Sequence, residues 1–401
     1  MEEALVSHIV EFKECTGCGA CAAVCPVKAI TLDGQPDGFA FASIDDDACI
    51  HCNRCREACP AINQAELRLQ EAVYAAQSPA REVLLRSASG GAFFELAQAF
   101  LQDGGTVYGA AMDIVDSAAH VAHEGVADVA GLSRLQGSKY AQGAAHPVFD
   151  EVKARLRRGE RVLFSGLPCQ VAGLYGYLGR GYDTLVTVDI FCHGNTSPHQ
   201  LNLYLRYLKD KHRRDVTDYV FRDKERGVGY KSRLTLANGK VVRMTALQEA
   251  YWYLFQTSKF YRESCYSCPY ACDRRVGDLS LGDFWGIERQ RPEVLVQNGG
   301  PLDSTYGISV ILANTDKGKS LVEASALVRE ECDIADVIPG GAAVRAPQPM
   351  PEDRSVVLQM FRAGDYAKIK RYCVRQMGFE YVYDLVCDTP PVKLLRRLLG
   401  R

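Results

Sequence analysis

The sequence predicts a chain of mixed α+β and α/β class, with a small cluster-stapled N-terminal domain followed by an α/β domain with a mixed sheet. Two cysteine runs of identical spacing lie within the first 60 residues. From Ala72 onward, apolar and amphipathic stretches alternate, as strands and helices do in α/β proteins. The 401 residues suffice for two or three domains. We expect domains at 1–65 and 72–340, and a C-terminal helical extension at 341–401.

The two cysteine runs have the spacing of bacterial two-cluster ferredoxins. Each reads Cys-x2-Cys-x2-Cys-x3-Cys-Pro, from Cys15 to Pro26 and from Cys49 to Pro60. In this spacing three cysteines of a run bind one 4Fe-4S cluster and the fourth reaches the other cluster. Zinc is the alternative, but two identical four-cysteine runs fit it poorly. The predicted ligand sets are Cys15, Cys18, Cys21 and Cys59 for one cluster, and Cys49, Cys52, Cys55 and Cys25 for the other.

The segment after Ala72 alternates between predicted strands and helices. Ser89 is a candidate N-cap for the first long helix. Asn238-Gly239 between apolar pairs predicts a hairpin with a type I′ turn, and 340–351 reads as a loop. We expect strands at 73–76, 106–111, 161–164, 185–191 and 307–313, and helices at 93–101, 149–156, 170 onward, 198–211 and 317–327.

A third cysteine group consists of Cys265, Cys268 and Cys272. Three thiolates need a fourth ligand for a closed site. Cys192 ends a predicted strand and Cys169 lies at a strand–turn–helix junction, so either can reach the crevice at the strand ends. Structural zinc with His193 as the fourth ligand is the alternative. We favour a third iron–sulfur cluster, because a chain with two clusters needs a conductor toward its catalytic site, and its fourth ligand is Cys192 or Cys169.

Glycine-rich stretches indicate a nucleotide-like cofactor. Ser87-Ala88-Ser89-Gly90-Gly91 precedes a predicted helix, where backbone N–H groups can bind phosphate. Gly137-Ser138-Lys139-Tyr140 combines a hydroxyl, a cation and an aromatic ring in one loop. No GxGxxG follows a predicted strand, which argues against a Rossmann NAD site.

Composition narrows the function classes further. Hydrophobic residues make up 47% and charged residues 24%, and the net charge of −2 makes nucleic acid an unexpected partner. No apolar run approaches the roughly 20 residues that span a bilayer, and the acidic N-terminus does not resemble a signal peptide. Eleven of the 16 cysteines lie in three groups with CxxC spacing, which favours metal over disulfides. We therefore expect a cytoplasmic protein without a transmembrane segment.

Taken together, several motifs resemble the coenzyme F-420 hydrogenase/dehydrogenase beta-subunit family with an N-terminal ferredoxin fusion. They occur in the family's order across about residues 72–320. The matching stretches are RSASGGAF, QGSKYAQ, FSGLPCQVAGL, DIFCHGNTSP, Phe221-Arg222-Asp223-Lys224, CYSCPYAC and LGDFWG.

The resemblance implies an FAD-containing iron–sulfur oxidoreductase. Its flavin would exchange a hydride with coenzyme F-420 or another organic substrate, and electrons would pass to or from a ferredoxin or a partner subunit. Lys139 would offset negative charge on the flavin, and His193 would donate a proton. Alternatives are an electron-transfer subunit without a substrate site, or a ferredoxin fused to a zinc-stabilised interaction module. The implied flavin residues are Ser87, Ser89, Gly90, Gly91, Gly137, Ser138, Lys139 and Tyr140.

Overall fold

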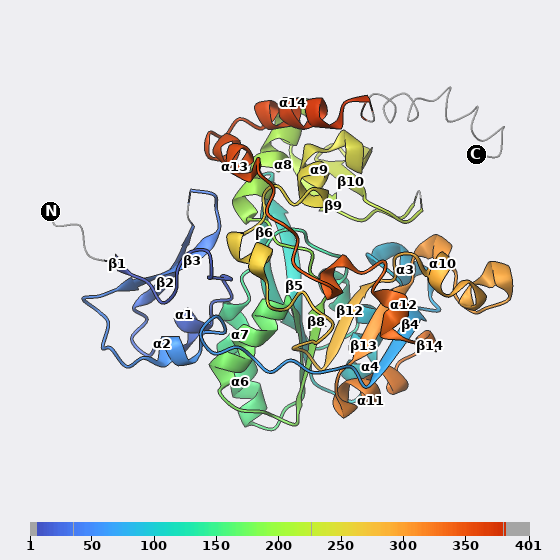
Figure 1. Cartoon of the computed structure of the whole chain (residues 1–401), viewed down its shortest axis with the longest axis horizontal. Coiled ribbons are helices and arrows are strands. Elements are labelled where there is room, and N and C mark those ends of the chain that lie inside the picture. Colours follow the sequence, from blue (N-terminus) through green and yellow to red (C-terminus); the bar gives the residue numbers. More distant parts are fainter. Residues whose placement is uncertain (1–5, 35, 226, 380, 382–401) are drawn as a thin grey trace.

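The computed structural model describes residues 6–34, 36–225, 227–379 and 381. In this part of the chain the strands form three sheets, of three, three and eight strands. The N-terminal unit lies at one end of the molecule, beside helices α6 and α7 of the larger α/β unit (Figure 1). The predicted fold class, a ferredoxin-type unit followed by an α/β unit with a mixed sheet, is confirmed.

The N-terminal unit pairs a small antiparallel sheet, in the order β1-β3-β2, with two short helices. Each helix follows a cysteine loop, so that α1 carries Cys21 and α2 carries Cys55. Aliphatic side chains of the sheet pack against the cysteines and form a small core. The elements are β1 (Val6–Ser7), α1 (Ala20–Val24), β2 (Ile30–Gly34), β3 (Ala40–Asp45) and α2 (Arg54–Glu57).

The large sheet has the order β14-β4-β13-β12-β8-β7-β5-β6. Its centre is parallel, from β5 through β7 and β8 to β12, and the outer strands are antiparallel. The carboxyl ends of parallel strands therefore share one edge, where ligands bind in such folds. The strands are β4 (Ala72–Gln77), β5 (Thr106–Val115), β6 (Ala118–Val126), β7 (Val162–Gly166), β8 (Leu185–Ile190), β12 (Leu279–Asp283), β13 (Ser309–Ala313) and β14 (Val328–Cys332).

Helices cover both faces of the large sheet. Helices α4 and α11 contribute to the apolar core on one face, and α6 and α7 to the core on the other. Ser89 does not cap α4, contrary to expectation: Gly91 is the N-cap, and the Ser89 hydroxyl donates to the Ile308 carbonyl. Between the N-terminal unit and residue 340, the α-helices are α3 (Arg81–Arg86), α4 (Ala92–Gln102), α5 (Leu132–Leu135), α6 (Phe149–Arg157), α7 (Pro168–Leu178), α8 (Pro198–His212), α9 (Ala250–Gln256), α10 (Ile287–Gln290), α11 (Asp316–Ala324) and α12 (Ile334–Val337).

A third, antiparallel sheet contains β9 (Val216–Val220), β10 (Lys231–Leu236) and β11 (Val241–Thr245). Its β10–β11 hairpin was expected to have a type I′ turn, which requires positive φ at both Asn238 and Gly239. Of these two only Gly239 has positive φ, +79°, so that expectation is wrong.

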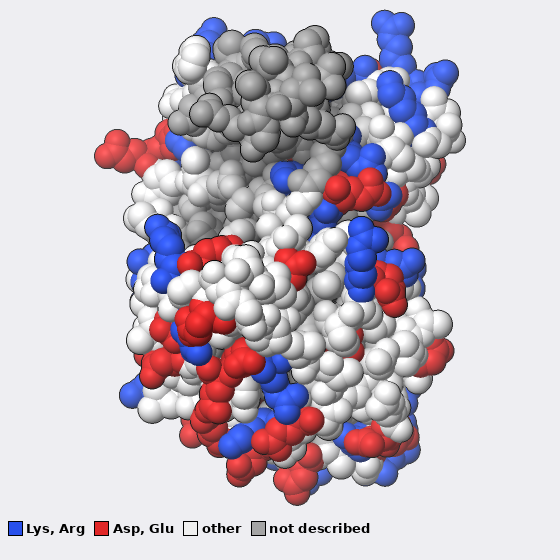
Figure 2. Space-filling view, turned by 90° about the vertical axis from the view of Figure 1, so that its right-hand side faces the viewer, with Lys and Arg blue, Asp and Glu red and all other residues white. Residues whose placement is uncertain are grey.

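The C-terminal helices α13 (Arg354–Arg362) and α14 (Tyr366–Met377) pack against α8 and α9 through one shared apolar core (Figure 1). Among the described residues, no helix is long and apolar enough to cross a membrane. Figure 2 shows positive and negative side chains interspersed over one face of the molecule.

Candidate redox centre and cofactor cavity

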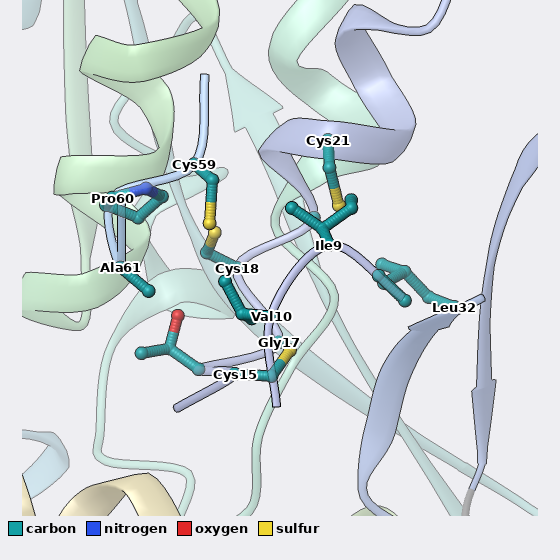
Figure 3. Close-up of a pocket in the computed structure, with 13 residues that line it drawn as sticks. Ile9, Val10, Cys15, Gly17, Cys18, Cys21, Leu32, Cys59, Pro60 and Ala61 are labelled. Carbon is teal, nitrogen blue, oxygen red and sulfur yellow. The ribbon is translucent and has the colours of Figure 1, made fainter. Parts of the chain in front are cut away.

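One thiol group, called here the inner group, combines both cysteine runs. Cys15, Cys18 and Cys21 of the first run line one pocket together with Cys59 of the second (Figure 3). Burial, followed by the nearby Cys15 and Cys59 thiols, raises the pKa of Cys18 to about 11. Buried thiols that repel one another when ionised suit a positively charged metal centre, whose binding releases their protons. This is the ligand set that the spacing predicted for the first cluster.

The other thiol group, called the outer group, consists of Cys25, Cys49, Cys52 and Cys55, and it is less buried than the inner group. Cys49 and Cys55 pack against the small core that contains Cys25. Cys52 is exposed, and its neighbour Ile50 is 58% exposed. The outer group therefore occupies the surface of the N-terminal unit, whereas the inner group lies against the α/β unit.

Two glycines of α7 allow this close approach. A Cβ atom at Gly173 would lie 3.0 Å from the Cys18 sulfur, and one at Gly176 would lie 2.2 Å from the Ala58 carbonyl oxygen. An ion pair also joins the N-terminal unit to helix α13: the Arg362 Nε lies 2.5 Å from the buried Asp37 carboxylate. Helix α7, which begins next to Cys169, thus connects the inner group to the third cysteine group.

The third group gathers five thiols at the edge of the α/β unit. Burial raises the pKa of Cys169 well above its usual range, and the Cys192, Cys268 and Cys265 thiols raise it further. The thiol of Cys272 lies close to Cys268 but donates to the Pro269 and Arg274 carbonyls. In the described residues, no three His, Cys, Asp or Glu side chains are arranged to hold a single metal ion. The fit to a cluster rests on the chemistry of the grouped thiols.

A cavity of about 410 Å³ opens beside this third group. Its volume lies within the range that small-molecule and cofactor sites have. Cys192 and His193 line the cavity from the end of β8. Gly90 does not line it but packs against β4 and β13, where a Cβ atom would lie 2.5 Å from the Ala76 carbonyl oxygen. The other residues predicted for the flavin all line the cavity: Ser87, Ser89, Gly91, Gly137, Ser138, Lys139 and Tyr140.

Two side chains hold the cavity loops in place. The Gln136 amide donates to the Val83 carbonyl and to the Ser87 hydroxyl, which joins the two glycine-rich loops. The Lys224 ammonium donates to three backbone carbonyls, those of Leu84, Ser89 and Tyr306. Three carbonyl acceptors fix the ammonium group, so Lys224 orders this wall of the cavity.

His193 has a defined hydrogen-bond partner. Its Nδ1 lies 2.9 Å from the Tyr261 hydroxyl, and that hydroxyl donates to the Phe255 carbonyl. Because Tyr261 has one proton to donate, Nδ1–H of His193 must be the donor to it, and Nε2 is left as an acceptor. Burial lowers the pKa of His193, which favours this neutral form. The expected role as a proton donor therefore requires His193 to take up a proton first.

Lys139 is anchored to its own loop. Its Nζ donates to the Arg134 and Gln136 carbonyls, each at 3.0 Å. Burial lowers the pKa of Lys139 to about 7. The ammonium group that was expected to offset cofactor charge therefore titrates near neutral pH.

Sequence reasoning missed several cavity residues. Asp283 lines the cavity, and each of its carboxylate oxygens accepts from Arg222 at 3.3 Å. The Arg222 guanidinium lies over the rings of Tyr230 and Trp285, 5.0 and 5.3 Å from their centroids. The stretches containing Arg222 and Asp283 were recognised as motifs, so motif membership was the available signal for these two residues, whereas their pairing is visible only in the structure.

Two orphaned polar atoms also belong to cavity residues. Nδ1 of His123 and Nδ2 of Asn195 are buried without a hydrogen-bond partner in the described part of the chain. Unpaired buried polar atoms are costly, and a polar cofactor is one way to satisfy them. No motif surrounds His123, which lies on β6, so nothing in the sequence marked it.

Comparisons with known proteins agree with two parts of this description. Residues 159–337 match the family described as the C terminus of the beta subunit of coenzyme F420 hydrogenase/dehydrogenase. Residues 14–63 match the 4Fe-4S dicluster domain. No curated protein sequence matches the chain.

Among solved structures, the chain is similar to one in the xenon-derivatised F420-reducing NiFe hydrogenase complex from Methanosarcina barkeri. The identity is 15% and the TM-score 0.42, over 77% of this chain and 93% of that one.

Proposed function

We propose that this chain is an iron–sulfur flavoprotein oxidoreductase. Behind its 4Fe-4S dicluster domain it carries a domain that matches the C terminus of the coenzyme F420 hydrogenase/dehydrogenase beta subunit. Electrons would pass between its clusters and FAD, with hydride exchange to coenzyme F-420 or another organic substrate. One observation carries the proposal: both glycine-rich loops, Cys192 and His193 line one cavity.

The residues around the cavity suit a flavin nucleotide. FAD supplies the conversion between one-electron and two-electron chemistry when it is bound. The Ser87–Gly91 loop precedes the 11-residue helix α4, whose N-terminal backbone N–H groups favour a phosphate. His123 and Asn195 offer polar atoms that have no hydrogen-bond partner among the described residues. Lys224 and Gln136 keep the loops ordered before any cofactor binds.

The positions of the thiol groups support an order of electron flow. The outer group, with the exposed Cys52, is accessible to a one-electron carrier such as a ferredoxin or a partner subunit. The inner group touches α7 at Gly173, and α7 starts beside Cys169 of the third group. Cys192 belongs both to the third group and to the cavity wall.

His193 would manage the proton that accompanies hydride chemistry. Its neutral ring keeps Nε2 as an acceptor, while Tyr261 fixes the ring through Nδ1. It would therefore accept a proton when the organic substrate is oxidised and return it in the reverse direction.

The first experiment counts iron, zinc and extractable flavin per chain in anaerobically purified protein. The proposal expects about twelve irons, one FAD and no zinc, since each 4Fe-4S cluster has four irons. About eight irons with one zinc and no flavin would overturn it and leave a ferredoxin fused to a zinc-stabilised module.

The same count on three variants identifies the ligands of the third cluster. We expect Cys192→Ala to lose about four irons, as predicted from the sequence. Cys169→Ala and Cys272→Ala form a matched pair. The variant that loses iron identifies the ligand that completes the site with Cys192, Cys265 and Cys268. Unchanged iron in Cys192→Ala would contradict its role and leave Cys169 to complete the site with the Cys265 group.

A further inference from the structure

Arg262 is a buried cation without an acidic partner. It is 1% exposed. Its Nε and Nη2 donate to the Gln142 amide oxygen at 3.0 and 2.7 Å, and Nη1 donates to the Cys15 carbonyl at 3.3 Å. Among the described residues, no carboxylate lies within ion-pair distance of it. Burying an uncompensated charge costs several kcal/mol, so a negative group is expected nearby.

Arg275 shows how this protein treats another buried arginine near the same cysteines. It is also 1% exposed, but its Nη2 lies 2.5 Å from the fully buried Asp189 carboxylate. Arg275 further donates to the Tyr270 and Cys272 carbonyls. Among the described residues, the fold therefore supplies a carboxylate to Arg275 but neutral oxygen acceptors to Arg262.

Arg262 lies between two thiol groups. Its Nη1 donates to the Cys15 carbonyl of the inner group, and its own carbonyl accepts from the Cys265 N–H of the third group at 3.1 Å. Burial lowers the pKa of Arg262, and ionised thiols of both groups would oppose that shift. A Cβ atom at Gly17 would lie 2.6 Å from its Nη2, so the loop of the first cysteine run closes over the guanidinium. Thiols of both groups would therefore act on this guanidinium once they are ionised as cluster ligands.

We propose that the inner and third iron–sulfur clusters supply the counter-charge of Arg262, and that Arg262 in turn raises their reduction potentials relative to that of the outer cluster. This rests on the clusters of the proposed function. Four thiolates make a cluster anionic, and reduction adds another negative charge. A cation in a region of low dielectric stabilises the reduced form most, and net charge is among the factors that set cluster potentials.

Tyr270 provides a second, independent observation at the same place. It is buried, and its hydroxyl has no hydrogen-bond partner in the described residues. Cys169 and Cys268 of the third group, and Cys18 and Cys59 of the inner group, all lie within its electrostatic reach. A hydroxyl without a protein acceptor can donate to cluster sulfur, and such hydrogen bonds also raise the potential.

The test is a redox titration of the intact anaerobic protein, followed by electron paramagnetic resonance. Arg262→Gln should shift the midpoint potentials of the inner and third clusters to more negative values, while the outer cluster keeps its potential. Arg262→Lys, which retains the charge, should stay closer to the parent protein. Tyr270→Phe removes only the hydroxyl and should give a smaller shift of the same sign.

The outer cluster is the internal reference for these variants. Unchanged potentials in Arg262→Gln, or an equal shift of all clusters, would overturn the proposal. Should Arg262→Gln fail to assemble, Arg262→Lys and Tyr270→Phe still test the proposal. Unchanged potentials in Tyr270→Phe, together with clearly more negative potentials in Arg262→Lys despite its retained charge, would contradict it. The redox titration needs neither flavin nor substrate. The absence of a flavin would therefore contradict the proposed function without affecting the measured cluster potentials.

Discussion

The two halves of the N-terminal unit share one sequence motif and occupy different surroundings. The inner thiol group is buried against α7, whereas the outer group exposes Cys52 and Ile50. The spacing within each run determines which cysteines meet, but it is identical in both and cannot distinguish the two groups. Their difference arises from α7, whose glycines receive only one of them. Docking thus turns a duplicated motif into an inner and an outer site.

The largest predicted difference in stability comes from removing one cysteine ligand from the inner group and one from the outer group. Cys18→Ser and Cys52→Ser should each lose about four irons. Cys18→Ser should also destabilise the chain by about 2–5 kcal/mol, because an emptied site remains in the packed contact with α7. Cys52→Ser should cost less than Cys18→Ser, since Cys52 is exposed and its loss leaves no emptied site in the contact with α7. Iron analysis and anaerobic urea unfolding measure both quantities.

Equal losses of stability in the two variants would contradict the comparison. Tryptophan fluorescence provides the probe, because the chain has two tryptophans, Trp252 and Trp285, and both lie in the α/β unit. It therefore detects the loss of docking through the unit that receives it.

A smaller effect should follow from filling the contact itself. Gly176→Ala places a Cβ atom 2.2 Å from the Ala58 carbonyl oxygen, and such overpacking costs about 1–3 kcal/mol. Gly181→Ala is the matched control, since its Cβ atom meets nothing within 4 Å, and it should be neutral or slightly stabilising. Faster proteolysis between the two units in Gly176→Ala alone would agree, and identical behaviour of both variants would argue against glycine-mediated docking.

The sequence predicted features that depend on local patterns, and it did not predict features that depend on contacts between distant segments, such as the docking on α7. Strands β4, β5, β7, β8 and β13 were found because they are continuous apolar runs. Strand β6 was missed because Ala and His alternate in it with little apolar contrast. The motifs identified the cavity loops, but the approach of His123 on β6 depends on antiparallel pairing with β5, which no local pattern encodes.

Acid should distinguish the α/β unit from the N-terminal unit. Burial lowers the pKa of His123, which lies in the α/β unit, to about 4, against about 6.5 in an unfolded chain. Between these values the unfolded state binds the proton and the folded state does not, so stability falls as the pH drops from about 6.5 toward 4. The loss for His123 between about pH 7 and pH 5.5 is roughly 1 kcal/mol.

The pKa values of His146 and His193 are also lowered by burial, and they act in the same direction. His123→Gln keeps an amide N–H for the Ser165 carbonyl, which His123 Nε2 contacts at 3.0 Å, and it cannot titrate. Urea unfolding followed by tryptophan fluorescence should therefore show a weaker pH dependence in this variant, while cluster absorbance reports mainly on the N-terminal unit, which would hold two of the three proposed clusters. An unchanged pH dependence would contradict this and mean that the pKa of His123 in the fold equals its value of about 6.5 in the unfolded chain.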